Sequence, residues 1–368
     1  MTSTRHVLGL SGGKDSTALA LYLHQRHPEL KLDYYFCDTG KELDEVYQTI
    51  EKLEAALGQK IQRLKAAAGT SEETPFDHFL EMYGGFLPSS QARWCTKKLK
   101  LDPFERFVGE TPTVSYVGIR DDEEREGYIS QKRNIQSLFP FRQNIWSQDV
   151  VRQVLANAET ERLLSLYRSV VGSDLSDRLT GTIHSPVSSA FPQAQKLRQL
   201  LDADTVAFNH VVFRFLKETD SGYPLTQEQA FPLLDNADRL VKANIFRLLE
   251  ESGVGVPQYY QNVEFEVDGQ KGSYARSRSG CFFCFFQQKI EWVWLLENHP
   301  ELFKRAMAYE KDGFAWNEGE TLAQLAEPER VANIKREFLK RSQREKPSSG
   351  YLMDILDDEG EGCAACFL

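Results

Sequence analysis

A glycine-rich turn near the start of the sequence constrains the fold more than any other feature. It follows a short apolar run of strand type at residues 6–10 and precedes the first turns of a helix at residues 16–22. A strand, a tight turn and a helix N-terminus direct backbone N–H groups and the positive end of the helix dipole at one point. The sequence therefore predicts an anion site formed by Ser11, Gly12, Gly13, Lys14, Asp15 and Ser16.

The residue types in this turn suit phosphate chemistry of a particular kind. A Walker-type loop would have glycine in place of Leu8 and serine or threonine in place of Asp15, so the turn is a different phosphate loop. The glycines allow a close approach of the backbone, Lys14 adds a positive charge, and Asp15 is a candidate ligand for Mg²⁺. We expect the side chains of Lys14 and Asp15 to point into solvent. The alternative is an ordinary tight turn.

The first third of the chain alternates strand-like and helix-like segments. Apolar runs at residues 6–10, 32–40 and 113–120 are separated by helical patterns such as residues 42–58. This alternation predicts an α/β fold, in which a parallel sheet carries helices on both faces. Ligands of such sheets bind at the carboxyl ends of the strands, where Ser11, Asp38 and Gly118 would lie.

Changes of pattern divide the chain of 368 residues into three regions. Residues 1–145 are the α/β domain, residues 146–252 are almost entirely helical and are interpreted as a helical insertion, and residues 253–368 form a cysteine-containing C-terminal region with an acidic tail. The insertion carries no catalytic motif, so we expect it to serve packing or a partner surface.

Charge and hydropathy limit the classes of partner. The formal net charge of −10 argues against a protein that grips nucleic acid with its whole surface, so any such contact should be local or supplied by partners. No run of about twenty apolar residues occurs, so no membrane span is expected. The first strand-like run begins too early to leave room for a secretory signal, which favours a cytoplasmic location.

Two further strand ends carry candidate ligands. Asp38 ends the second run and is a candidate for Mg²⁺ or a nucleotide hydroxyl, while Gly40 would let the backbone approach a ligand. The alternative for this segment is a plain strand-ending turn. Arg120 ends the third run, where its guanidinium is well placed for a polyphosphate. Cys37 lies just inside the second strand and is interpreted as a small buried hydrophobe.

Four of the six cysteines form two Cys-x-x-Cys pairs, Cys281 with Cys284 and Cys363 with Cys366. Cytosolic cysteines stay reduced unless they bind metal or do redox work, so the pairs indicate thiolate sites. The aromatic residues around the first pair suit an iron–sulfur cluster, although structural zinc uses the same spacing. The basic residues before this pair are candidates to offset cluster charge or to contact an anionic substrate. They are Lys271, Arg276 and Arg278.

Cys95 stands in a basic segment, RWCTKKLK. Because neighbouring cations lower the pKa of a thiol, Cys95 is a candidate thiolate for metal binding or sulfur chemistry. The alternative is an isolated cysteine on a solvated basic helix.

The order of these motifs resembles that of the phosphoadenosine phosphosulfate reductase family within the PP-loop ATP pyrophosphatases. The resemblance runs through SGGKDS, DTGKELDEV, RWCTKKLK, GIRDDEEREGY and WSQDV, and then through GVGVPQYY and RSGCFFCFF. It implies a Rossmann-like (HUP-type) sheet that binds ATP with Mg²⁺. In that case residues 11–16 form the pyrophosphate loop, Asp38 and Gly40 approach the nucleotide, and Arg120 meets the phosphates or the substrate.

The combination of RWCT with a downstream GCxxC is more similar to the ATP-pyrophosphatase component of bacterial DNA phosphorothioation systems of the Dnd and Ssp kinds. That resemblance implies an iron–sulfur cluster of the [4Fe–4S] kind held by Cys95, Cys281 and Cys284. Cys363 or Cys366 would complete the cluster or carry sulfur. The implied partners are a cysteine desulfurase, DNA reached through partner proteins, and other components of a DNA modification complex.

Two other functions stay open. Sulfonucleotide reductases of the family use a cysteine in a C-terminal Glu-Cys-Gly-x-His type sequence, whereas this chain ends in EGCAACFL without the histidine. Sulfonucleotide reduction is therefore the second hypothesis. The third is a zinc-stabilised nucleotide-binding scaffold of a defence complex, for which the helical insertion would be the interaction surface.

Overall fold

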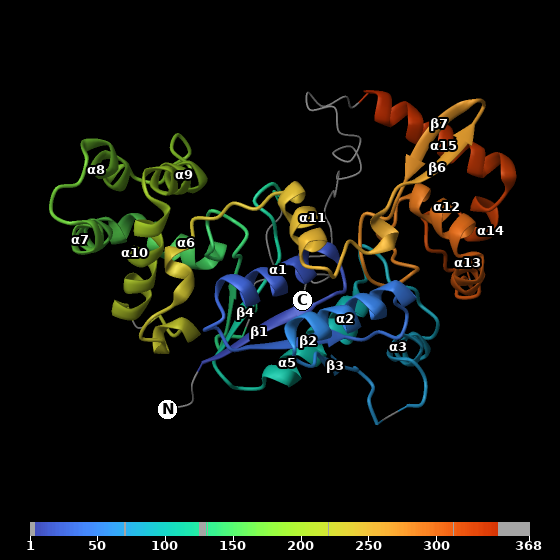
Figure 1. Ribbon diagram of the computed structural model, residues 1–368, viewed down its shortest axis with the longest axis horizontal. Helices are drawn as coiled ribbons and strands as arrows, with labels where there is room; N and C mark the ends of the chain where they lie inside the picture. The colour runs from blue at the N-terminus through green and yellow to red at the C-terminus, as the bar shows by residue number, and fades with distance from the viewer. Residues whose placement is uncertain are drawn as a thin grey trace.

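The centre of the molecule is a five-stranded parallel sheet with helices on both faces, so the α/β fold class is confirmed (Figure 1). The computed structural model describes residues 4–344 except 70, 125–129, 131, 220 and 312. In spatial order the strands are β3 (Gln62–Leu64), β2 (Leu32–Cys37), β1 (Arg5–Leu10), β4 (Thr113–Tyr116) and β5 (Ile135–Leu138).

Side chains of alternate direction cover the two faces of this sheet, which is why its strands read as nearly continuous apolar runs. Leu8 and Phe36 belong to the large core that includes α1 (Lys14–Arg26) and α2 (Asp44–Leu57). Val7 and Tyr35 point the other way and pack against α5 (Asp102–Val108).

The strand order reverses next to β1. The chain passes from β1 through α1, β2 and α2 to β3 at one edge, and then returns to β4 and β5 on the other side of β1. The returning segment contains α3 (Pro75–Met82), α4 (Trp94–Thr96) and a π-helical turn, η1 (Lys97–Leu101), that leads into α5. In open parallel sheets the ligand crevice lies outside the carboxyl ends of the strands at such a reversal.

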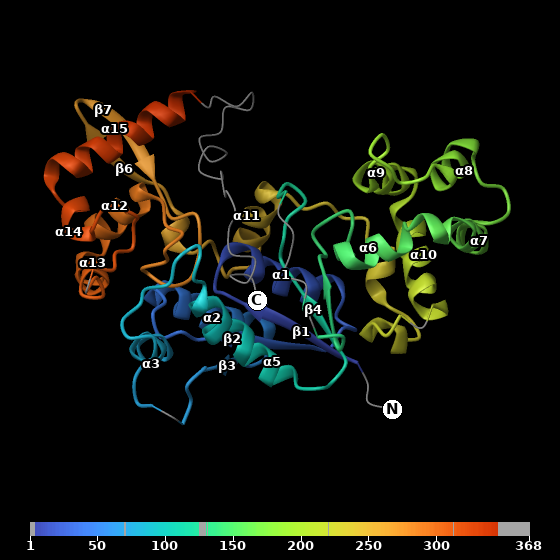
Figure 2. The same ribbon diagram turned by 180° about the vertical axis from the view of Figure 1, so that it is seen from behind.

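The described chain between β5 and β6 contains helices, as its sequence pattern predicted. They are α6 (Gln148–Val154), η2 (Asn157–Glu159), α7 (Thr160–Val171), α8 (Asp177–His184), α9 (Gln193–Ala203), α10 (Thr205–Glu218), η3 (Pro224–Gln227), η4 (Pro232–Asp235) and α11 (Lys242–Glu251). Figures 1 and 2 show α6 to α10 on one side of the sheet, whereas α11 packs on α1. The domain boundaries drawn from the sequence stay a prediction.

The C-terminal region lies at the opposite side of the sheet from α6 to α10 (Figures 1 and 2). It contains η5 (Gln258–Tyr260), the antiparallel pair β6 (Val263–Val267) and β7 (Gln270–Tyr274), and the helices α12 (Lys289–Asn298), α13 (Pro300–Met307), α14 (Leu322–Leu325) and α15 (Pro328–Arg344). None of the helices in the described part of the chain is both long and apolar enough to cross a membrane.

A buried polar chain connects the helical region with the sheet. The Trp146 Nε1 donates to Asn209 Oδ1 at 2.9 Å, and Asn209 Nδ2 donates to the carbonyl of Asn236 at 3.1 Å. Asn236 Nδ2 in turn donates to the carbonyl of Pro140, just after β5, at 2.9 Å. Buried polar groups cost free energy when unpaired, so this chain holds the α10 helix in one position against the sheet.

We expect Asn209→Leu to lower the free energy of unfolding by about 1–3 kcal/mol, because it leaves the Trp146 N–H and the Asn236 carbonyl unpaired. Urea denaturation measures the change. The matched control is Gln195→Leu at an exposed position of α9, which should change stability by less than about 0.5 kcal/mol. Equal stability of the two variants would contradict this role of Asn209.

Candidate functional site

The glycine loop (residues 11–16) joins β1 to α1, and the structure explains why both of its glycines are needed. Gly12 has a φ of +68°, and a Cβ there would lie 2.6 Å from Val46 Cγ1. At Gly13, the N-cap of α1, a Cβ would lie 2.5 Å from the Oγ of Ser279. Glycine is therefore required at the first position by its dihedral angle and at both positions by close packing.

Two serine hydroxyls shape the glycine loop from inside. Ser16 Oγ accepts from the backbone N–H of Ser11 at 3.2 Å, and Ser11 Oγ accepts from the N–H of Gly13 at 3.3 Å. The N-terminus of α1 opens at this loop, so its N–H groups and the helix dipole face the same point. A phosphate oxygen can replace a hydroxyl as acceptor on such N–H groups.

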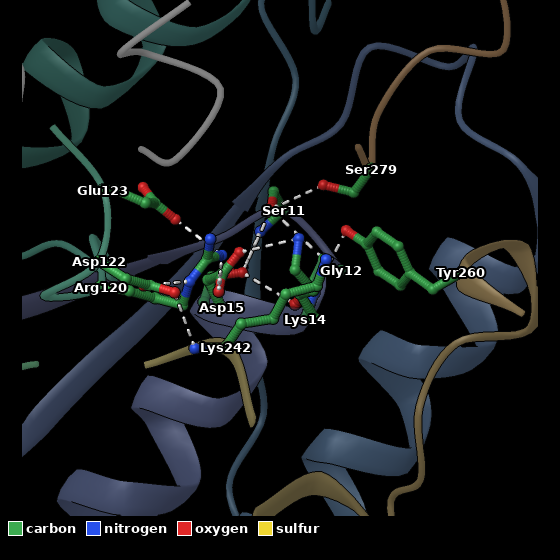
Figure 3. Close-up of polar contacts among 12 residues, drawn as sticks. Ser11, Gly12, Lys14, Asp15, Arg120, Asp122, Glu123, Lys242, Tyr260 and Ser279 are labelled. Carbon is green, nitrogen blue, oxygen red and sulfur yellow. Dashed lines mark hydrogen bonds and ion pairs between the residues drawn. The ribbon is translucent and has the colours of Figure 1, made fainter. Parts of the chain in front are cut away.

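Lys14 and Asp15 lie in a buried network of charges, which corrects the expectation that they point into solvent (Figure 3). Both side chains are only 3% exposed, and Lys14 Nζ lies 3.5 Å from Asp15 Oδ2. Asp15 Oδ1 pairs with Arg120 Nη1 at 2.9 Å. The expectation was wrong because segments that are distant in sequence cover the first turn of α1.

Arg120 lies among three carboxylates. Besides Asp15 it contacts Asp122 at 2.9 Å and Glu123 at 2.7 Å. Burial by itself lowers the pKa of the Arg120 guanidinium, but the three carboxylates raise this pKa further, so the net shift is upward. Gly118, two residues earlier, also contacts the loop, since a Cβ there would lie 2.9 Å from the carbonyl oxygen of Asp15. The predicted residues Lys14, Asp15 and Arg120 thus come together.

Three side chains from the C-terminal region cover the glycine loop, and Figure 3 shows two of them, Tyr260 and Ser279. Tyr259 donates its hydroxyl hydrogen to the carbonyl of Gly12 at 2.7 Å, and Tyr260 Oη accepts from the N–H of Lys14 at 3.4 Å. The Lys14 ammonium also lies 4.8 Å from the centroid of the Tyr260 ring. Ser279 Oγ donates to Ser11 Oγ at 3.0 Å.

The sequence patterns did not single out Tyr259, Tyr260 and Ser279 as loop contacts. The motifs GVGVPQYY and RSGCFFCFF contain all three, but neither motif indicates which part of the chain it meets. The predicted anion site is therefore lined by groups from the N-terminal domain and from the C-terminal region.

Asp38 organises the turn that follows β2. Its Oδ1 accepts from the backbone N–H of Gly40 and from the Tyr47 hydroxyl, both at 2.9 Å, and its Oδ2 lies 3.7 Å from Lys65 Nζ. Gly40 has a φ of +75°, and a Cβ there would lie 2.7 Å from the Cβ of Thr74. The strand-ending turn of the alternative interpretation is therefore present at the predicted edge of the sheet.

The cysteine turn (residues 281–284) lies against this same segment. Thr39 Oγ1 is 2.6 Å from Glu42 Oε1 and 3.2 Å from Cys281 Sγ. The backbone of Cys281 bridges to Glu42, and the N–H of Phe282 donates to the carbonyl of Lys41 at 2.9 Å. Burial is the main cause that raises the pKa of the Cys281 thiol well above its usual value. The thiol is therefore protonated at neutral pH unless a metal ion or another cation stabilises the thiolate.

Cys95, Cys281 and Cys284 line one cavity of about 40 Å³. Most of the other lining residues are aromatic or apolar, namely Phe76, Pro88, Leu99, Phe283, Phe285, Phe286 and Trp316. Within the described residues, no group of three or more His, Cys, Asp or Glu side chains is arranged to hold a metal ion. Cys363 and Cys366 lie outside the described residues, so their predicted role stays a prediction.

Cys37 differs from these three cysteines. It is buried, its thiol donates to the carbonyl of Lys100 at 3.6 Å, and burial raises its pKa to about 12. The interpretation of Cys37 as a small buried hydrophobe is confirmed.

The charge of Arg276 bears on whether a metal–thiolate group suits the cysteine turn. The side chain is buried, and its Nη2 donates to the carbonyl of Cys281 at 3.1 Å. Among the described residues, its Nε and Nη1 have no hydrogen-bond partner, and no carboxylate forms an ion pair with it. A buried unpaired cation is costly, whereas thiolate ligands would bring negative charge to this position. The chemistry of three thiols beside a buried cation would suit an anionic metal–thiolate group, although the described side chains are not arranged as metal ligands.

Comparison with known proteins agrees with the architecture of the N-terminal part. Residues 5–150 match the family model described as the phosphoadenosine phosphosulfate reductase domain. A protein of Methanocaldococcus jannaschii, described as uncharacterized, is 31% identical over 146 residues, which are 36% of this chain and 28% of that relative. The matched domain contains the glycine loop, Asp38, Cys95 and Arg120, whereas Tyr260, Ser279 and the cysteine turn lie beyond it.

We expect Gly13→Ala to lower the stability by about 1–3 kcal/mol, because its Cβ would overlap the Oγ of Ser279. Thermal unfolding measures this loss. Gly181→Ala in α8 is the matched control, since nothing lies within 4 Å of a Cβ there and alanine favours the helix. Adding Ser279→Gly to the Gly13→Ala variant should recover part of the loss. Additive losses in the double variant would mean that the two residues do not touch.

Proposed function

We propose that this protein is an ATP pyrophosphatase that adenylates a phosphate oxygen of the DNA backbone and so prepares it for sulfur insertion. The observation that supports this most is the contact between the glycine loop and the segment that leads into the cysteine turn. Ser279 Oγ is bonded to Ser11 Oγ at 3.0 Å, and Cys281 follows two residues later against the turn after β2. A phosphate site and a thiol site that share one segment suit a reaction that couples phosphate activation to sulfur transfer.

The proposed reaction has two displacements at phosphorus. In the first, the acceptor oxygen attacks the α-phosphorus of ATP, the bond from that phosphorus to the bridging oxygen breaks, and pyrophosphate leaves. In the second, the terminal sulfur of a cysteine persulfide attacks the phosphorus of the adenylated acceptor, and AMP leaves with the acceptor oxygen. A second thiol then breaks the sulfur–sulfur bond by forming a disulfide with the carrier cysteine. Adenylation is needed because an unmodified phosphate oxygen is a poor leaving group.

The residues of the glycine loop would stabilise the charge that develops in the first step. Lys14 and the N–H groups of the loop would contact the departing phosphates, which is mainly electrostatic stabilisation. Asp15 would hold Mg²⁺, which supplies positive charge next to the phosphates. Arg120 would then exchange its contact with Asp15, at 2.9 Å, for a phosphate oxygen while Asp122 and Glu123 still hold its guanidinium. Asp38 and Gly40 would approach the nucleotide from the end of β2.

The cysteine side of the site would supply the sulfur. Cys95, Cys281 and Cys284 would hold a [4Fe–4S] cluster, with Cys363 or Cys366 as a fourth ligand or a sulfur carrier. The sulfur donor would be a cysteine desulfurase, and DNA would be reached together with other components of a modification complex. Zinc in place of the cluster is the alternative metal.

A sulfonucleotide reductase is the second candidate, and the match of residues 5–150 to the phosphoadenosine phosphosulfate reductase domain is the observation that favours it. Such an enzyme reduces its substrate with a thiol reductant and needs no ATP cleavage. Formation of AMP and pyrophosphate from ATP therefore separates the two candidates.

We expect Lys14→Met to lower the rate of pyrophosphate release from ATP by about 10²–10³-fold, because the variant keeps the buried volume but loses the charge beside the phosphates. Lys52→Met, at an exposed position of α2, is the control and should retain the wild-type rate. A thermal melt establishes that both variants are folded. A folded Lys14→Met protein with near-normal release would remove the glycine loop from the active site.

We expect protein purified without oxygen to be brown and to contain iron and sulfide, and Cys281→Ser or Cys284→Ser each to lose this colour. Cys95→Ser should do the same, because Cys95 lines the same cavity. Cys37→Ala is the matched control and should stay coloured, since Cys37 packs against α5 instead. Absorption spectra with iron and sulfide assays measure the result. A colourless wild-type protein with stoichiometric zinc would refute the cluster.

A further inference from the structure

A surface of cations and aromatic rings borders the cysteine cavity. We call it the basic–aromatic rim, and it is formed by Tyr83, Phe86, Arg93, Lys97, Arg278 and Phe286. The Phe286 ring carries two guanidinium groups, with Arg93 at 5.0 Å and Arg278 at 5.6 Å from its centroid. These contacts join segments that are far apart in the sequence into one surface.

The rest of the rim is tied to Trp94. The Tyr83 ring packs on the Trp94 ring with centroids 5.2 Å apart, and Trp94 Nε1 donates to the carbonyl of Phe86 at 3.0 Å. Trp94 itself is buried in the core. Tyr83 and Phe86 are therefore held in place although 41% and 39% of their surfaces are exposed.

Within the part of the chain that the structure describes, no carboxylate pairs with the cations of the rim. Arg93, Lys97 and Arg278 form no ion pair with any described carboxylate, whereas the neighbouring Lys98 is bonded to Asp102 at 3.0 Å. In a chain with a net charge of −10, three unpaired cations at one place are a local exception. Such a cluster attracts a polyanion even when the whole protein repels it.

The aromatic rings indicate which class of polyanion the rim binds. Single-stranded nucleic acid binds where backbone phosphates meet cations and bases stack on exposed rings or on guanidinium planes. Tyr83 and Phe86 are exposed rings, and Phe286 with its two guanidinium groups is a second stacking surface. A site for an apolar partner would need no cations, and a site for a simple polyanion would need no exposed rings. The rim has both.

The rim also lies where an acceptor strand would have to pass. Phe286 lines the cavity together with Cys95, Cys281 and Cys284. Arg93 precedes Cys95 by two residues and Arg278 precedes Cys281 by three. A strand bound at Phe286 would therefore lie next to the lining of the cysteine cavity.

We propose that the basic–aromatic rim binds a DNA strand, with backbone phosphates on Arg93, Lys97 and Arg278 and an unpaired base stacked on the rings. The choice of DNA rests on the proposed function, whereas the rim itself is inferred from its contacts and charge. The rim is the entry side for the acceptor and is separate from the glycine loop that would bind ATP.

Fluorescence anisotropy of a labelled single-stranded DNA with the full chain, measured over a range of salt concentrations, tests this proposal. Removing three phosphate contacts with Arg93→Ala, Lys97→Ala and Arg278→Ala should reduce the slope of log affinity against log salt by about 2. Affinity should fall at least about tenfold. The control replaces Arg178 and Arg198, two exposed cations of the helical region, by alanine and should bind as wild type.

A second variant separates stacking from charge. Tyr83→Ala should weaken binding of single-stranded DNA by about fivefold or more and leave the salt slope unchanged, because the tyrosine ring contacts a base and not a phosphate. Wild-type protein that binds no nucleic acid, or a triple variant that binds DNA as tightly as the control, would overturn the proposal. A clear preference of the rim for RNA of the same sequence would overturn the choice of DNA.

ATP binding, measured on the same proteins by equilibrium dialysis, keeps the two proposals apart. The triple variant should bind ATP with wild-type affinity, because none of its residues lies in the glycine loop. DNA binding through the rim by a protein that does not bind ATP would refute the proposed function and leave the rim standing. ATP cleavage by a protein whose rim does not bind DNA would refute the role of the rim and leave the proposed function standing.

Discussion

The hydrogen bond between Ser279 and Ser11 is the contact on which the arrangement of the site depends. It joins residues that are 268 positions apart, and it is possible only because Gly13 carries no side chain where the serine approaches. Together with the contacts of Tyr259 and Tyr260, it places the C-terminal region on the N-terminus of α1, with the cysteine turn at the carboxyl edge of the sheet. The predicted anion site and the cysteine turn are consequently connected by one short segment, in which Ser279 contacts the glycine loop and Cys281 contacts Thr39.

The buried charges of the glycine loop and those beside the cysteine turn differ in whether they are paired. At the glycine loop the charges are paired within the protein, since Asp15 contacts both Lys14 and Arg120. A polyphosphate with a divalent cation could replace these pairs by exchange, without leaving any charge unpaired. At the cysteine turn the Arg276 guanidinium has two N–H groups without a partner in the described chain. The positive charge of Arg276 beside the cysteine turn is therefore not compensated by the described residues, and an anionic group bound to the thiols would compensate it.

The sequence predicted those parts of the fold that depend on a local pattern of residues. The strands β1, β2 and β4 and the glycine loop follow from apolar runs, glycines and a helix start in direct succession. The edge strand β3 has three residues and no buried side chain, so no apolar run marks it. The burial of Lys14 and its contact with Tyr260 depend on a segment about 250 positions away, and no local pattern carries that information. The convergence of Cys95 with the cysteine turn was suggested by family resemblance alone.

We propose that nucleotide binding at the glycine loop and the chemistry of the cysteine turn occur in one site. The most direct measurement is the alkylation rate of Cys281, followed by mass spectrometry, with and without a saturating ATP analogue whose α,β-bridge cannot be cleaved. Phosphates on the loop should displace Ser279, two residues from Cys281, and change this rate about fivefold or more. An unchanged rate while the analogue is bound would show two independent sites and contradict the account.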